Sequence, residues 1–200
     1  MSTESIFRIA FWSLLGTLLL VRGYFSLQVR KAGERLMPDR GAIEREGRAL
    51  FAVRVLMFFL LLAWLVLYAI NPSWMGVLAV PFPDWLRWLG LALGLASLGF
   101  LAWTQAALGK EWSPQLQLRE GHHLVTTGPY ARVRHPLYTA GVGWMASLAL
   151  LTANWIFVIL MVVTIAGLVA RVPKEEQMMI EEFGEEYKAY MQKTGRFFPT

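Results

Sequence analysis

Residues 136–170 read PLYTAGVGWMASLALLTANWIFVILMVVTIAGLVA, a run of 35 residues without Asp, Glu, Lys or Arg. As one helix this run would be about 52 Å long, whereas the hydrocarbon core of a bilayer is about 30 Å thick. The polar break at residues 152–154 divides the run into two apolar segments, 136–151 and 155–172. We therefore predict a tight helical hairpin of two short membrane spans. The alternative is a re-entrant pair that never reaches the far side.

Two further charge-free runs lie N-terminal to the hairpin. Residues 55–83 form a run of 29 and residues 88–109 a run of 22. Of the 200 residues, 56% are hydrophobic and 16% charged, whereas soluble domains average about 45–50% and about 25%. An ordinary soluble domain is excluded, and the composition indicates an all-α, polytopic membrane protein.

Five membrane helices are predicted, of which the last two form the hairpin. The first three are expected at residues 6–24, 50–70 and 84–108, with Asp84 as an N-cap and Gly109 at the C-terminal end of the third. A cytoplasmic helix is expected near the C-terminus. Residues 1–200 are treated as a single membrane domain.

The Lys and Arg residues predict how the helices are oriented. Eight lie in residues 22–54, four in residues 109–135 and five in residues 171–200, out of 19 in all. The connections 71–83 and 152–154 hold none. Because basic segments stay on the cytoplasmic side, we expect the N-terminus outside and the C-terminus inside. This distribution also explains the net charge of +5 without nucleic acid as a partner.

Two local patterns leave alternatives open. The mixed charges of the basic loop 26–48 fit either an amphipathic helix on the membrane surface or a solvated connector. The spacing of Gly90 and Gly94 allows close helix packing, against either an internal helix or a dimer partner.

Several chemistries are excluded. The chain has no Cys and three His, two of them adjacent, so a metal site is not expected. Neither the P-loop nor the Gly-rich Rossmann fingerprint occurs.

Polar residues concentrate in two segments next to the hairpin. In the first, Gly128-Pro129-Tyr130 is a turn signal, and Arg134-His135-Pro136 follows at the mouth of the hairpin. Helix N-terminal amides there favour an anion. A bound carboxylate or phosphate and a simple interface anchor both fit. Tyr138 follows, and Gly141 leaves room for a ligand or helix.

The second segment opens with Arg171 and continues with Glu175-Glu176. The two acids fit either a solvated surface or a pocket, capped by the hairpin mouth, that holds hydroxyls, an amine or a cation. Farther on, four glutamates are expected to form the exposed face of one helix, and three aromatic residues its buried stripe: Glu181, Glu182, Glu185 and Glu186, and Phe183, Tyr187 and Tyr190.

Over residues 109–199 the chain resembles the isoprenylcysteine carboxyl methyltransferase and phospholipid methyltransferase superfamily of integral-membrane methyltransferases. The matching residues, in order and spacing, are Gly128-Pro129-Tyr130, Arg134-His135-Pro136-x-Tyr138 with Gly141, Glu175-Glu176, Phe183-Gly184-x-x-Tyr187-x-x-Tyr190 and Arg196-x-x-Pro199. The first two predicted helices and loop 26–48 carry no matching signature. The resemblance makes residues 109–200 the catalytic half.

The resemblance implies S-adenosylmethionine bound at the cytoplasmic face. It implies catalytic roles for Arg171, Glu175 and Arg196, with Arg171 and Arg196 on the acceptor side. Residues implied to bind the cofactor are Gly128, Tyr130, Arg134, His135, Pro136, Tyr138, Gly141, Glu175 and Glu176. His135 would face the methionine carboxylate, and the two glutamates the ribose or amino group.

The leading hypothesis is therefore a methyltransferase for a lipophilic or amphipathic acceptor, with an isoprenylcysteine-like carboxylate favoured over a phospholipid amine or a small thiol. The short chain predicts a prokaryotic inner-membrane protein with the bilayer as a partner and no metal. An NADPH-dependent reductase of the sterol-reductase type is an alternative, although the glutamate pair disfavours a phosphate-bearing cofactor. A non-catalytic membrane protein is the third hypothesis.

Overall fold

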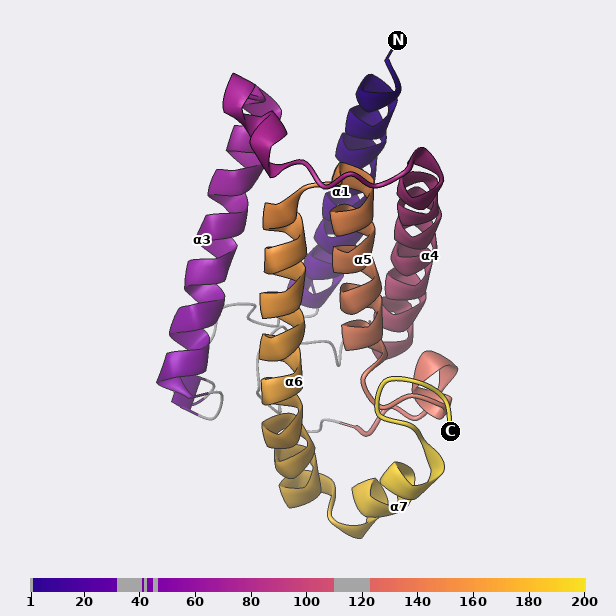
Figure 1. Cartoon of the computed structure of the whole chain (residues 1–200). Coiled ribbons are helices and arrows are strands. Elements are labelled where there is room, and N and C mark those ends of the chain that lie inside the picture. Colours follow the sequence, from indigo (N-terminus) through magenta and orange to yellow (C-terminus); the bar gives the residue numbers. More distant parts are fainter. Residues whose placement is uncertain (1, 32–40, 42, 45–46, 110–122) are drawn as a thin grey trace.

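The computed structural model describes residues 2–31, 41, 43–44, 47–109 and 123–200. Its elements in chain order are α1 (Thr3–Lys31), α3 (Arg48–Ile70), η1 (Ser73–Leu78), α4 (Asp84–Leu108), η3 (Gly128–Ala131), α5 (Pro136–Thr152), α6 (Trp155–Phe183) and α7 (Glu185–Lys193). The long helices run side by side, and α7 lies across one end of the bundle (Figure 1). Within the described residues, extended pairing is limited to two isolated bridges. The all-α fold is confirmed.

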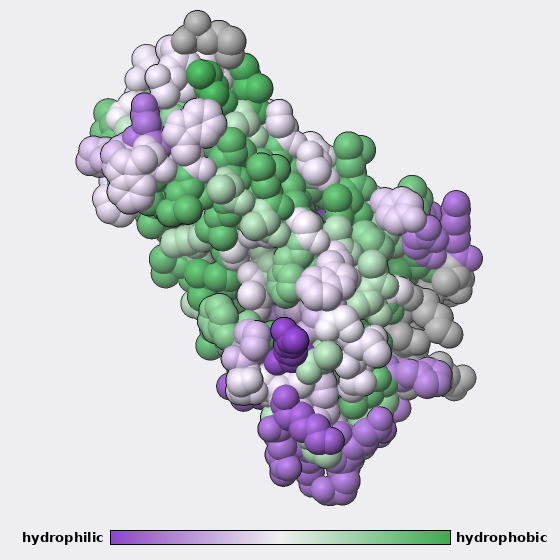
Figure 2. Space-filling view, turned by 90° about the vertical axis from the view of Figure 1, so that its right-hand side faces the viewer, coloured by the Kyte–Doolittle hydropathy of each residue, from purple (hydrophilic) through white to green (hydrophobic). Residues whose placement is uncertain are grey.

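Four of the described helices, α1, α3, α4 and α6, are long and apolar enough to cross a membrane. Helix α5 has 17 residues, a length of about 25 Å. Hydrophobic residues cover much of the helical bundle, while hydrophilic ones gather at the end that carries α7 (Figure 2). The chain is an integral membrane protein.

The hairpin forms where the polar break predicts it. Ala153 adopts a left-handed conformation with φ 47°, and the Asn154 side chain accepts a hydrogen bond of 2.9 Å from the Ile156 amide. The Val80 amide donates to the Ala153 carbonyl at 2.7 Å. The turn therefore lies beside the connection between α3 and α4, at an end of the bundle. This placement favours two full crossings over a re-entrant pair.

The predicted helix bounds are correct for α4 and too short for α1 and α6. Arg22 does not interrupt α1, which continues to Lys31, and α6 runs on through polar helix-forming residues to Phe183. A membrane span ends where the apolar segment ends, but the helix can continue beyond it through polar residues that favour helix. The predicted cap of α4 is wrong, because Pro83 occupies the N-cap position and Asp84 is the first helical residue.

The expectation of one helix over the acidic and aromatic residues near the C-terminus is also wrong. Gly184, with φ 54°, separates α6 from α7. Glycine adopts this left-handed conformation at little cost. Tyr187 and Tyr190 of α7 are buried as predicted, whereas Phe183 is half-buried at the end of α6.

The small residues of α4 pack against α5, so the internal partner predicted for Gly90 and Gly94 is confirmed. A Cβ atom on Gly90 would lie 2.8 Å from Leu150 Cβ, and one on Gly94 would lie 2.4 Å from Ser147 Oγ. The two backbones can approach this closely because neither glycine has a side chain. Loop 26–48 lies mostly outside the described residues.

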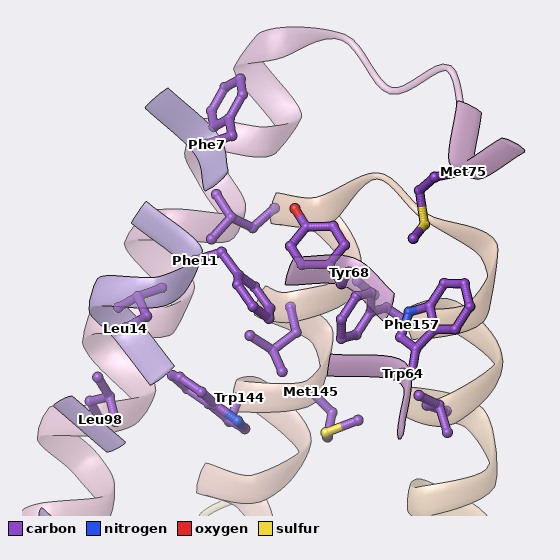
Figure 3. Packing of buried hydrophobic residues seen from close by; sticks show 14 residues of the cluster. Phe7, Phe11, Leu14, Trp64, Tyr68, Met75, Leu98, Trp144, Met145 and Phe157 are labelled. Carbon is purple, nitrogen blue, oxygen red and sulfur yellow. The ribbon is translucent and has the colours of Figure 1, made fainter. Parts of the chain in front are cut away.

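An aromatic cluster joins α1, α3 and α6 in the half of the bundle farther from α7 (Figure 3). The ring of Phe11 lies 4.8 Å from that of Tyr68 and 5.5 Å from that of Phe157. Such tilted and edge-on contacts add to the stabilisation from buried area. This cluster fixes α1 and α3 against the hairpin, and so positions the walls of the cavity at the other end.

Candidate functional site

A cavity of about 430 Å³ lies at the end of the bundle near α7, between α1, α3, α4, α5 and α6. Seven of the residues predicted for the site line it, namely Tyr130, Arg134, His135, Tyr138, Gly141, Arg171 and Glu175. Its volume falls in the range of small-molecule sites, roughly 300–1,000 Å³. The two polar segments flanking the hairpin thus meet around one cavity.

The path of α6 explains why the two adjacent glutamates face different surroundings. Arg171 and Glu175 are four residues apart, so they share one face of the helix, and both line the cavity. Glu176 is turned by about 100° from Glu175. Its carboxylate points away from the cavity wall, toward the C-terminal tail.

Glu176 is the centre of a buried cluster of charges. One carboxylate oxygen lies 3.2 Å from Arg134 Nε, 3.3 Å from His135 Nε2 and 3.2 Å from Arg196 Nε. The other lies 2.6 Å from Arg196 Nη2. A buried carboxylate of this kind costs free energy unless it is paired, and here three groups pair with it. The cluster ties α6, the hairpin mouth and the tail together.

Glu175 is held at the cavity by aromatic neighbours. The Tyr138 hydroxyl donates a hydrogen bond to its carboxylate, and His135 Nδ1 lies 3.9 Å from the same group. The rings of His135 and Tyr138 stack at 5.4 Å with a 7° angle between their planes. Glu175 keeps 29% of its side chain exposed, compared with 6% for Glu176. It is therefore the carboxylate of the pair that a ligand can reach.

The C-terminal tail runs along the mouth of the hairpin and holds it in place. The amides of Arg134 and His135 donate to the carbonyls of Gly195 and Arg196 at 2.8 and 3.1 Å. Thr139 Oγ1 donates to the Phe197 carbonyl at 2.7 Å. Arg134 Nη1 also donates to the Met191 carbonyl at 2.9 Å. The motif at the mouth is thereby positioned by residues about sixty places later.

Helix α7 anchors the turn that precedes the hairpin. The Tyr190 hydroxyl donates to the Tyr130 carbonyl at 2.7 Å. Burial raises the pKa of Tyr190 to about 12. Burial and then the nearby charge of Glu175 raise the pKa of Tyr130 above its usual range. Both phenols therefore stay protonated at physiological pH, and the Tyr190 hydroxyl acts as a hydrogen-bond donor to the Tyr130 carbonyl.

Four predicted site residues lie outside the cavity wall. Glu176 and Arg196 pair with each other, as described, and Arg196 leaves 49% of its side chain exposed. Gly128 packs against α4, where a Cβ atom would lie 3.1 Å from Ala107 Cβ. Pro136 is buried in the first turn of α5. These residues support the shape of the site from behind.

Two charged residues of the cavity were not predicted from the sequence. Arg22 of α1 and Arg54 of α3 line the cavity together with Arg171 and Arg134, so within the described residues four arginines and one carboxylate surround it. Residues on both sides of the predicted division at residue 109 therefore line the cavity. The sequence did offer a signal for both residues. An arginine within or next to an apolar span costs free energy and usually has a function.

An apolar groove of about 300 Å³ continues from the cavity between α3 and α6. Arg54, Met145 and Arg171 belong to both. A Cβ atom on Gly167, which also lines the groove, would meet no atom within 4 Å. The groove therefore has an open apolar part and a junction with the cavity that carries two arginines. No group of three or more metal-ligating side chains is found in the described part of the chain.

Comparison with known proteins bears on this same region. Residues 88–181 match the model of the isoprenylcysteine carboxyl methyltransferase family. This segment, slightly less than half of the chain, is similar to that family. The matched segment runs from the first turns of α4 to the end of α6 and contains His135, Glu175 and Glu176. The resemblance drawn from the motifs is confirmed.

Individual relatives of the family segment carry different names. A protein-S-isoprenylcysteine O-methyltransferase B of Arabidopsis thaliana is 32% identical over 88 residues, which are 42% of this chain and 45% of the relative. A nickel-cobalt-cadmium resistance protein of Alcaligenes xylosoxydans xylosoxydans is 29% identical over 113 residues, 56% of this chain and 52% of the relative. An uncharacterized protein of Bacillus subtilis (strain 168) is 28% identical over 132 residues, which are 64% of this chain and 71% of the relative. The chain thus spans about half the length of the first two.

Proposed function

We propose that this protein is an S-adenosylmethionine-dependent methyltransferase with its active site in the 430 Å³ cavity. The observation that carries the proposal is the convergence of His135, Tyr138 and Glu175 on one cavity that continues into an apolar groove. The family match over residues 88–181 supports the reaction class. The groove supports an acceptor with an apolar part.

The residues of the cavity fit S-adenosylmethionine chemically. This cofactor carries an amino group, a sulfonium, a carboxylate and an aromatic base. Glu175 would pair with the cationic groups of the cofactor, and Arg22 and Arg134, the two cavity arginines that do not line the groove, would pair with its carboxylate. Tyr130 and Trp144 offer aromatic surface for the base. A Cβ atom on Gly141 would meet nothing within 4 Å, so the backbone there borders space for a ligand.

The charges at the junction of cavity and groove favour an acidic acceptor. Arg54 and Arg171 line both spaces, so a molecule with its tail in the groove would place its polar end between them. A guanidinium binds a carboxylate through two parallel hydrogen bonds and orients it. We therefore propose a carboxylate acceptor with an apolar tail.

The chemistry asks for positioning rather than proton transfer. S-adenosylmethionine supplies an activated methyl group, so holding a nucleophile in line with it removes much of the barrier. A carboxylate is a nucleophile without deprotonation, and Arg54 and Arg171 would orient it. A thiol or amine acceptor would need a base, for which Glu175 is the nearby group. The surrounding helices would exclude water from the reacting atoms.

Binding of an NADPH-like cofactor is the competing use of the same cavity. The glutamate pair disfavoured it from the sequence, but Glu176 is neutralised by its partners, and four arginines line the cavity. The charges around the cavity therefore do not favour S-adenosylmethionine over NADPH. The family match favours the methyltransferase.

Calorimetric titration of the purified full chain in detergent separates these activities. We expect S-adenosylmethionine and S-adenosylhomocysteine to bind, and NADPH not to bind. If neither sulfur compound bound at millimolar concentration, the proposed function would be wrong. Binding of NADPH in their place would assign a reductase, and no binding of any of the three would favour a non-catalytic protein.

The acceptor is tested by methyl transfer from labelled S-adenosylmethionine to membrane lipid extracts. We expect the label in base-labile methyl esters, as a carboxylate acceptor requires. The variant Arg171→Gln should raise the KM for the acceptor and leave the affinity for S-adenosylhomocysteine within about twofold. Label in a base-stable amine or thioether product would replace the acid with the phospholipid amine or thiol alternative.

A further inference from the structure

A second cavity, of about 340 Å³, lies at the opposite end of the bundle from α7. It is bordered by the first turns of α1 and α4, by η1 and by the turn between α5 and α6. The methyltransferase proposal makes no use of this cavity. Its residues come from both halves of the chain.

The distribution of basic residues singles this cavity out. Of the 19 Lys and Arg residues, all but Arg8 and Arg87 lie in the three basic segments 22–54, 109–135 and 171–200. Arg8 and Arg87 both line the second cavity, although they are far apart in sequence. Basic residues are disfavoured on the translocated side of a membrane. Two of them converging on one cavity there call for a local reason.

Arg87 is buried, with 8% of its surface exposed, and is held rigidly. Its Nε donates to the Leu151 carbonyl at 3.0 Å, and its Nη1 lies 2.7 Å from a carboxylate oxygen of Glu4. The guanidinium carbon lies 4.0 Å from the centre of the Phe7 ring. These contacts fix the plane of the guanidinium. They involve Nε and Nη1 and do not include the second terminal nitrogen, Nη2.

Two buried polar atoms of the cavity residues have no hydrogen-bond partner within the described part of the chain, namely Arg87 Nη2 and the Tyr68 hydroxyl. Buried donors are nearly always paired, so each calls for a partner beyond the described residues. Both belong to residues that line the same cavity. The guanidinium of Arg8 lies 4.5 Å from the Tyr68 ring, which adds a second positive charge beside them.

We propose that this cavity binds an oxyanion group, such as a phosphate, which accepts hydrogen bonds from Arg87 Nη2 and the Tyr68 hydroxyl. Arg8 and Arg87 carry two positive charges, and Glu4, which balances one of them, keeps 54% of its side chain in solvent. The charge left over attracts an anion. The group belongs either to the headgroup of an anionic lipid or to a small solute, because both present the same oxygens.

The test uses the full chain in phosphatidylcholine nanodiscs, titrated with inorganic phosphate by calorimetry. We expect saturable binding of phosphate to the wild type. Binding should be at least tenfold weaker in Arg87→Lys, because lysine keeps the positive charge but lacks the terminal nitrogen Nη2. Tyr68→Phe should weaken phosphate binding severalfold and still fold, because it removes a hydroxyl that has no hydrogen-bond partner among the described residues. Arg48→Gln is the matched control, since Arg48 is exposed at the other end of the bundle.

A second arm repeats the measurements in nanodiscs that contain phosphatidylglycerol. Loss of phosphate binding there, with a rise in thermal midpoint that Tyr68→Phe and Arg87→Lys lack, would assign the site to a lipid headgroup. Unchanged phosphate binding would assign it to a solute. The proposal is overturned if neither phosphate nor phosphatidylglycerol distinguishes the wild type from these two variants, in which case the cavity holds water only.

Discussion

Glu175 and Glu176 are neighbours in the sequence, but the turn of α6 between them gives their carboxylates different partners. Glu175 accepts from Tyr138 at the cavity, whereas Glu176 meets Arg134, His135 and Arg196 behind it. The sequence motif treats the pair as one unit. The structure separates a residue that can contact a ligand from one that holds the site together.

Replacing Glu175 by Gln should weaken binding of S-adenosylhomocysteine by about tenfold or more. The change removes the negative charge that would face the amino group, which S-adenosylhomocysteine keeps, and charged hydrogen bonds are worth about 1.5–3 kcal/mol. The matched control is Glu185→Gln, because the Glu185 side chain is 86% exposed and pairs with Lys188 on α7. Calorimetry measures both. Equal losses in the two variants would show that the cofactor binds elsewhere.

Replacing Glu176 by Gln should destabilise the protein. Removing one partner of a fully buried ion pair costs roughly 3–5 kcal/mol, and we expect on the order of 2 kcal/mol here because Arg196 is half exposed. The loss is read from denaturant unfolding in detergent, together with faster amide hydrogen exchange at Arg134 and His135. An unchanged stability in Glu176→Gln, alongside lost cofactor affinity, would mean that Glu176 acts on the ligand instead.

At the scale of helices, the close contact between α4 and α5 sets the frame of the cavity. A Cβ atom on Gly90 would lie 2.9 Å from the backbone nitrogen of Leu151, which cannot move without shifting α5. On the same helix, Gly99 has no atom within 4 Å of such a position. These two glycines form a matched pair for measuring what the contact contributes.

Gly90→Ala should therefore lower the free energy of unfolding by about 1–3 kcal/mol, the usual cost of overpacking. Gly99→Ala should raise it by about 0.5–1 kcal/mol, because alanine loses less backbone entropy in a helix. Denaturant titration in detergent, followed by circular dichroism, compares them. If both substitutions stabilised the protein, α4 and α5 would not be in the close contact described.

The sequence predicted elements better than the relations between them. Charge-free runs and the break at residues 152–154 located the last four of the five apolar helices, because hydrophobicity is a local signal. The motifs found most of the charged and polar residues of the cavity wall. Arg22 and Arg54 were missed, since their place at the cavity depends on how α1 and α3 pack against the hairpin. The different partners of Glu175 and Glu176 follow from the helical turn between them. The helix was predicted to end at residue 172, so both glutamates were expected outside it.

At the scale of the whole molecule, each end of the bundle has its own cavity, and the two cavities differ in the number of arginines that line them. The end near α7 gathers arginines around an opening to an apolar groove, and the opposite end has a small polar cavity with Arg8 and Arg87. The hairpin connects them, since its mouth lies at one end and its turn at the other (Figure 1). Because α1, α3, α4 and α6 are long and apolar enough to cross a membrane, the two cavities would lie on opposite sides of it.

This topology can be measured directly, because the chain has no Cys and any introduced thiol is the sole target. In right-side-out membrane vesicles, an impermeant maleimide should label Ser2→Cys and Ser73→Cys. It should label Thr200→Cys only after the vesicles are opened, because five crossings and the basic segments place the C-terminus inside. Ser73→Cys tests the connection between α3 and α4 independently of the termini. Labelling of both termini from the same side would require an even number of crossings. Helix α5, whose 17 residues are the fewest among these membrane helices, would then have to be reassigned as re-entrant.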